Sequence, residues 1–210
     1  MKNNIIVKNS LYVTSIMAII ILFITILFWN RMPMTQRLIG LYYFLIAAHE
    51  WEEMKLPGGF IEMVISLTNM PVKDMTIPKF CLFLVTVYML LVPYCIPGVH
   101  WLVIGPLVLG IIEPVVHVIV GKANPKTRIY SPGLVTSVLF MVPIDVFTIY
   151  YITMRESFAW YHWLIAAIFL LIPLFGVQRF IVVRLLKMSY SEFVKNAKNS
   201  ILGKNDKFDT

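Results

Sequence analysis

The chain has few charged residues for its length, and this scarcity excludes several classes of protein. Asp, Glu, Lys and Arg make up 14% of the 210 residues, whereas about 25% is usual in soluble domains. Apolar residues reach 59% and the mean hydropathy is +0.80. A disordered chain, a coiled coil and a water-soluble domain are therefore excluded. The composition predicts an all-α protein, a polytopic transmembrane helical bundle, and the length fits one domain.

Acidic residues and cysteines are scarce as well. The chain has 18 Lys and Arg but only 11 Asp and Glu, so the net charge is +7. The basic residues lie between and after apolar runs, where cytoplasmic loops and anionic headgroups account for them. We therefore expect membrane lipids, and not nucleic acid, as partners. Along one helix Cys81 and Cys95 would lie about 21 Å apart, too far for a disulfide.

Apolar runs without charged residues divide the chain into segments of the length that a bilayer requires. The pattern predicts a transmembrane helical domain over residues 1–188 and a basic cytoplasmic tail over 189–210. About six spans are expected, near 11–29, 38–54, 78–96, 99–120, 133–154 and 158–181. Five spans remain an alternative, in which one segment only dips into the membrane. The stretch 60–70, which follows Pro-Gly-Gly, is predicted to be interfacial or re-entrant.

The positions of Lys and Arg predict the orientation, because cytoplasmic loops are enriched in both. The loop that carries Lys122, Lys126 and Arg128 is basic, and so is the C-terminal tail. Both are expected in the cytoplasm, together with the N-terminus. Arg31 and Arg37 then fall outside, and this exception keeps the count of five spans open.

Two groups of ionisable residues lie inside predicted spans, where such residues are costly and mark functional sites. His49, Glu52 and Glu53 fall within an arc of about 100° on the second span, since successive helical residues are about 100° apart. Glu113 and His117 share a face of the fourth span. Both groups lie toward the cytoplasmic ends of their spans, so we expect the two helices to bring them to one depth.

Imidazole and carboxylate groups at these spacings are typical of divalent-metal sites on helices. The predicted metal ligands are His49, Glu53, Glu113 and His117, and this oxygen-rich set suits zinc, iron or manganese. Glu52 and Glu53 are the predicted catalytic residues, with Glu52 as a ligand or as a general base. One ion, two ions and a purely structural polar cluster all remain open. The metalloprotease pattern H-E-x-x-H is absent, because position 53 is Glu.

Further polar residues on the same side are candidates for binding a substrate. Pro132-Gly133 opens the fifth span, and the N-terminus of a helix attracts anions. Asp145, midway along that span, is either a partner in an inner cavity or part of a hydrogen bond that stabilises the bundle. The candidates for holding a substrate headgroup are Lys122, Lys126, Arg128, Tyr130 and Thr136.

Two short motifs resemble a known family. Residues 49–53 (HEWEE) together with residues 57–60 (PGGF) resemble the signature of the HXXEE-domain membrane proteins, a bacterial-centred family of uncharacterised function. The resemblance covers roughly residues 38–155. It implies a multi-span membrane fold, a location in a bacterial cytoplasmic membrane and a suspicion of metal chemistry.

Together these residues favour an integral membrane enzyme with a metal-dependent site near the cytoplasmic leaflet. A hydrolase-type or oxidase-type reaction is expected, with a lipid or isoprenoid-like substrate that reaches the helices from the bilayer. A bound metal lowers the pKa of its water to about 7. A metal-free acid–base isomerase of a hydrophobic substrate is one alternative. An ion- or proton-coupled transporter, or a metal-binding membrane protein, is the other.

Overall fold

The computed structural model describes residues 5–72, 74–124 and 130–202, and within these ranges it contains helices and loops but no β-strand. The first half of the chain forms α1 (Ile5–Lys8), α2 (Ser10–Leu27), the 3₁₀ turn η1 (Trp29–Arg31), α3 (Met34–Met54), α4 (Phe60–Thr68) and α5 (Thr76–Cys95). The second half forms α6 (Trp101–Ala123), α7 (Leu134–Thr136), the π-helical segment η2 (Ser137–Met141), α8 (Val142–Arg155), α9 (Tyr161–Arg179), the π-helical segment η3 (Phe180–Leu185) and α10 (Tyr190–Ile201).

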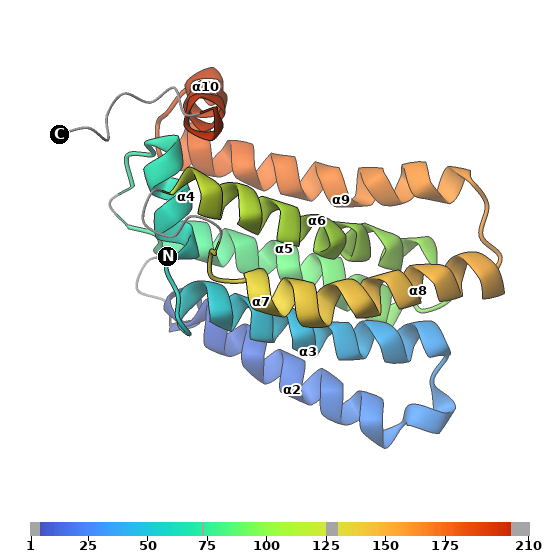
Figure 1. The fold of residues 1–210 in the computed structure, drawn as a ribbon. Coiled ribbons are helices and arrows are strands. Elements are labelled where there is room, and N and C mark those ends of the chain that lie inside the picture. The colour runs from blue at the N-terminus through green and yellow to red at the C-terminus, as the bar shows by residue number, and fades with distance from the viewer. Residues whose placement is uncertain (1–4, 73, 125–129, 203–210) are drawn as a thin grey trace.

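The long helices run side by side along one axis, and consecutive ones alternate in direction (Figure 1). α7, η2 and α8 follow one another without a break, as do α9 and η3, so each series forms one rod. The turns that follow α2, α5 and α8 lie at one end of the bundle, which we call the far end. α4 and α10 lie at the opposite end (Figure 1), which we call the α4–α10 end.

Five helices are long and apolar enough to cross a membrane, which supports the predicted integral membrane protein. They cover Ser10–Leu27, Thr76–Cys95, Trp101–Ala123, Leu134–Arg155 and Tyr161–Leu185. α3 has 21 residues, or about 31 Å of helix, and packs along α2. It is less apolar because it carries His49 and three glutamates. By length and composition five helices are thus candidate spans, and α3 runs antiparallel beside α2 as a sixth rod of similar length (Figure 1).

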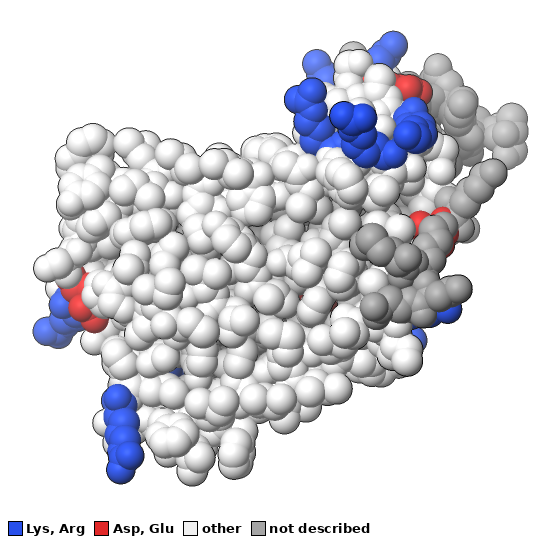
Figure 2. All heavy atoms as spheres, turned by 180° about the vertical axis from the view of Figure 1, so that it is seen from behind, with Lys and Arg blue, Asp and Glu red and all other residues white. Residues whose placement is uncertain are grey.

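The bundle buries a tight central seam and leaves apolar side chains on its outer faces. Ile39 and Tyr42 of α3 and Leu107 of α6 are fully buried. Ile16 and Phe23 on α2 are exposed instead. Figure 2 shows the charged side chains gathered at the two ends of the molecule, with a broad uncharged band between them. A band of this kind suits the hydrocarbon core of a bilayer.

Two short helices cover the α4–α10 end. α4 has nine residues, too few to span a bilayer, and occupies the stretch predicted to be interfacial or re-entrant. α10 packs on α4, where Asn196 Nδ2 donates to the Thr68 carbonyl at 3.1 Å and the Ser200 hydroxyl donates to the Leu67 carbonyl. Residues 190–201 of the predicted basic tail thus form a helix that is held against the bundle.

Candidate functional site

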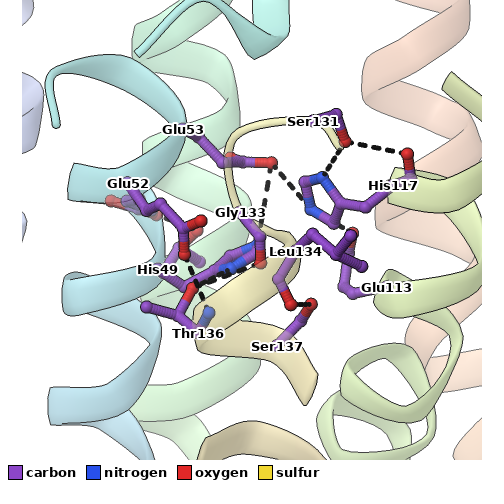
Figure 3. Close-up of polar contacts among 12 residues, drawn as sticks. His49, Glu52, Glu53, Glu113, His117, Ser131, Gly133, Leu134, Thr136 and Ser137 are labelled. Atoms are coloured by element: carbon purple, nitrogen blue, oxygen red, sulfur yellow. Dashed lines mark hydrogen bonds and ion pairs between the residues drawn. The ribbon is translucent and has the colours of Figure 1, made fainter. Parts of the chain in front are cut away.

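Four ionisable side chains from two helices meet near the α4–α10 end of the bundle. His49 and Glu53 come from α3, and Glu113 and His117 come from α6 (Figure 3). One donor atom from each lies within 4.8 Å of the other three. The spacing of four residues places each pair on one face of its helix, and both helices pack against α7 and η2. The structure thus brings these four residues together, and we call them the His/Glu cluster.

Glu53 lies at the centre of the His/Glu cluster. Its Oε1 is 3.6 Å from His49 Nε2 and 3.4 Å from His117 Nε2. Glu113 Oε2 lies 3.7 Å from the same nitrogen of His117. The two imidazole rings stand nearly perpendicular, with their centroids 5.2 Å apart. Both histidines are buried, so the two carboxylates face two imidazoles in a site that is largely closed to water.

A hydroxyl group orients each imidazole through Nδ1. Ser131 Oγ lies 3.0 Å from His117 Nδ1, and Thr136 Oγ1 lies 2.9 Å from His49 Nδ1. The Ser131 hydroxyl donates to the His117 carbonyl at 2.8 Å, and the Thr136 hydroxyl donates to the Gly133 carbonyl at 3.2 Å. Since a hydroxyl has one proton to donate, each accepts from its imidazole. We therefore assign the proton to Nδ1 in both rings, which leaves a lone pair on each Nε2.

The lone pairs on Nε2 of His49 and His117 determine which kind of ligand the cluster can bind. His117 Nε2 is fully buried and has no hydrogen-bond donor within the described part of the chain. An unpaired buried polar atom costs about 1–3 kcal/mol. Two imidazole lone pairs beside two carboxylates form an electron-rich set without a donor of its own. Such a set fits a divalent metal ion, and binding of a metal remains a prediction.

Gly133 closes the cluster from the side of α7. Its φ is +103°, a conformation that favours glycine. A Cβ atom at this position would collide with the His117 ring and would lie 2.9 Å from Cε1 of His49. The sequence marked Pro132-Gly133 as the start of a helix, but nothing in the local pattern indicated that the backbone would touch both imidazoles. This residue was therefore missed as part of the site.

Glu52 points away from the His/Glu cluster and binds the start of the next helix. Its Oε2 accepts from the backbone N–H of Thr136 at 2.8 Å, and its Oε1 accepts from that of Val135 at 3.2 Å. The Tyr130 hydroxyl donates to Oε1 at 3.3 Å. The N-terminus of α7 thus attracts an anion, as its sequence predicted, but the anion is a carboxylate of the same chain. Glu52 is not one of the four donors of the cluster.

The structure describes three of the five residues predicted to bind a headgroup. Thr136 contacts His49, and Tyr130 contacts Glu52. Burial and the Glu52 carboxylate raise the pKa of the Tyr130 hydroxyl, so this group remains a donor at neutral pH. Lys122 is exposed in the last turn of α6. Lys126 and Arg128 lie outside the described residues. Binding of a headgroup by these side chains stays a prediction.

Asp145 lies inside the bundle but outside the His/Glu cluster. It is fully buried on α8, and neither carboxylate oxygen has a hydrogen-bond partner within the described part of the chain. A Cβ atom on Gly110 would collide with both this carboxylate and the Tyr42 hydroxyl. Gly110 precedes His117 by seven residues, about 10 Å along α6. Asp145 therefore occupies a separate, deeper level of the bundle.

The fold and the site define a helical integral membrane protein with a buried His/Glu cluster. Residues 40–148 match the family described as "protein of unknown function with HXXEE motif". This match covers more than half of the chain, so the chain belongs to the HXXEE family. No match to the chain was found among curated proteins or solved structures.

Proposed function

We propose that this protein is a membrane-embedded metalloenzyme whose His/Glu cluster binds one divalent ion. One observation carries the proposal: two imidazoles and two carboxylates offer donor atoms within 4.8 Å of one another. The Nδ1 atoms of both imidazoles are held by the hydroxyls of Ser131 and Thr136. Histidines that bind metals are commonly oriented through their second ring nitrogen in this way.

The donor set narrows the choice of ion and the kind of chemistry. Two nitrogen and two oxygen donors suit zinc, iron or manganese better than calcium or copper(I). Sites of this kind can keep a position for water beside the protein ligands. A bound ion supplies Lewis acidity and a water molecule whose pKa is near 7. A hydrolase-type reaction needs both, so we propose this reaction class.

We assign different roles to Glu53 and Glu52. Glu53 lies against both imidazoles and also lines an apolar cavity. We therefore assign it two roles, as ligand and as the group that takes a proton from the attacking water. Glu52 has both oxygens occupied by α7 and Tyr130. We assign it a positioning role, since it holds Thr136, which in turn holds His49.

The apolar surroundings of the His/Glu cluster favour a hydrophobic substrate. The helices around it present apolar side chains on their outer faces, so a lipid or isoprenoid-like molecule can reach it from the bilayer. α10 carries Lys195 and Lys198, and basic side chains gather at this end of the molecule (Figure 2). This charge supports a cytoplasmic position for the α4–α10 end.

Metal analysis of protein purified without chelators tests the proposal. We expect about one equivalent of metal in the wild type and a loss of roughly tenfold or more in His117→Ala, since a ligand is removed. His100→Ala is the matched control, because His100 Nε2 also lies close to a glutamate, Glu156 at 3.3 Å, but at the far end. The control should keep the metal content of the wild type.

Two outcomes would overturn this function. A wild-type protein that neither contains nor takes up zinc, iron or manganese would exclude a metalloenzyme and would favour the metal-free acid–base isomerase. Full metal content in His117→Ala would place the ion elsewhere in the chain. If His117→Ala does not fold, Glu113→Gln removes one carboxylate ligand at nearly constant size and answers the same question.

A further inference from the structure

An apolar cavity of about 240 Å³ opens beside the His/Glu cluster. Its walls come from α3, α4, α5, α9, η3 and α10. The lining side chains are apolar apart from Glu53 and Gln178. The Gln178 carbonyl oxygen accepts from the Tyr190 hydroxyl at 2.8 Å, so its hydrogen bond is made within the protein. Glu53 is thus the ionisable group in the wall of the cavity.

The cavity is long in the direction of the bundle axis. On α5 it touches residues 78, 82 and 85, and on α9 and η3 it runs from residue 174 to residue 182. Each series covers one face of a helix over seven or eight residue steps, or about 10–12 Å. A cavity of this length that follows two neighbouring helices fits part of an extended hydrocarbon chain.

The cavity connects directly to the His/Glu cluster. Glu53 lines the cavity and lies 3.4 Å from His117 Nε2. Phe60 lines it too, and its ring lies against the His117 ring, with the centroids 4.3 Å apart. A molecule whose chain fills the cavity would therefore place its polar end at the cluster.

We propose that this cavity binds the alkyl chain of a single-chain amphiphile and places its oxygen-bearing head at Glu53. The position of the head rests on the proposed function, but the chain site stands on the cavity alone. The volume of about 240 Å³ is below the roughly 300–1,000 Å³ of pockets for drug-sized ligands, which favours one chain over a two-chain lipid. The apolar lining matches a hydrocarbon chain taken from the bilayer.

A larger groove on the opposite side of α3 suits such a ligand less well. It has a volume of about 630 Å³ and runs between α2, α3 and α7, where Ile19 and Glu52 belong to its walls. Both carboxylate oxygens of Glu52 already accept hydrogen bonds from α7. The groove therefore offers no free carboxylate to a ligand head and has no direct contact with Glu53.

Photocrosslinking with a palmitic acid that carries a diazirine group on its chain tests this site. We expect adducts at Leu82 on α5 and Leu174 on α9, and a strong reduction of both by excess unlabelled palmitic acid. Val85→Trp fills the inner part of the cavity and should lower these adducts roughly tenfold. Ile19→Trp, in the groove beside α2, is the matched control and should leave them unchanged.

The remaining outcomes separate the chain site from the metal. Adducts at Leu82 and Leu174 should persist after the protein is treated with a chelator, because the chain site does not require the metal. If the protein binds no metal but these adducts form, the proposed function is refuted and the chain site is retained. Adducts confined to the groove, or adducts on the outer faces that unlabelled palmitic acid does not reduce, would overturn the chain site. If Val85→Trp does not fold, Val64→Trp on α4 blocks the same cavity.

Discussion

Both ends of the bundle place a histidine beside a glutamate, but the two pairs differ in their surroundings. At the far end His100 Nε2 lies 3.3 Å from Glu156, and both side chains are about a quarter exposed. Thr35 Oγ1 is 3.5 Å from His100 Nδ1, at the limit of a hydrogen bond. In the His/Glu cluster His117 is fully buried, and its Nδ1 lies 3.0 Å from Ser131.

The comparison shows that a short distance between histidine and glutamate does not by itself make a metal site. The far-end pair is closer than any histidine–glutamate pair of the cluster. The cluster adds burial, imidazoles with a fixed orientation and four donors that face one another. If these features matter, changes that remove them should affect the cluster and spare the far end.

The largest effect is expected from Gly133→Ala. The added Cβ would collide with the His117 ring, and φ at this position is +103°, so both imidazoles must move. We expect metal affinity to fall by about 100-fold or more, since ligand orientation is lost. Competition with a chelator of known affinity measures this change.

Gly98→Ala is the control for this substitution. Gly98 belongs to the far-end loop, and a Cβ there meets no described atom within 4 Å. Metal affinity and thermal stability should stay at the values of the wild type. Equal affinities for Gly133→Ala and Gly98→Ala would show that the close approach of Gly133 does not shape the site.

A smaller effect is expected from Ser131→Ala, which removes the hydroxyl at His117 Nδ1. Loss of such a partner lowers metal affinity by about 10–100-fold, because the ring is then free to rotate and to change tautomer. Thr35→Val is the matched control, since it removes the hydroxyl near His100. The same chelator competition applies. A wild-type affinity in Ser131→Ala would contradict the assignment of the proton to Nδ1.

The smallest effect is expected from Glu52→Gln, which acts on the cluster through Thr136. The amide presents N–H groups to the backbone N–H groups of Val135 and Thr136, so one of the two hydrogen bonds is lost. We expect metal affinity to fall by about tenfold or less, while Glu156→Gln at the far end has no effect. Unchanged affinity together with a turnover slowed by about 10²–10⁴-fold would instead support Glu52 as a general base.

Several features of the fold could be predicted because they depend on local sequence alone. The run expected at 78–96 forms α5 (Thr76–Cys95), and the run expected at 158–181 begins at Tyr161 as α9. Apolar runs bounded by glycine, proline and charge leave few other solutions in a bilayer. The stretch 190–201 was predicted only as part of a basic cytoplasmic tail, because its two lysines and other polar residues hide the apolar face that packs on the bundle.

The contacts of three glutamates on α3 could not be predicted from the sequence around them. Glu50 accepts from the Thr86 hydroxyl of α5 at 2.9 Å. Glu52 binds the start of α7, and Glu53 enters the cluster. Neighbouring positions differ by about 100° around a helix, so these side chains leave α3 in different directions. The helical periodicity predicts the direction in which each glutamate side chain leaves α3, but it does not predict which helix packs on that side.

The sequence by itself determined the class of protein, the approximate positions of its long apolar helices and the two ionisable pairs, because composition and the helical repeat act within a few residues of each other. His49 with Glu53, and Glu113 with His117, share a face wherever their helices pack. Only the tertiary structure decided that these faces meet, that Ser131 and Gly133 complete them, and that an apolar cavity ends at Glu53. Those contacts join residues far apart in the chain, and they depend on how whole helices pack.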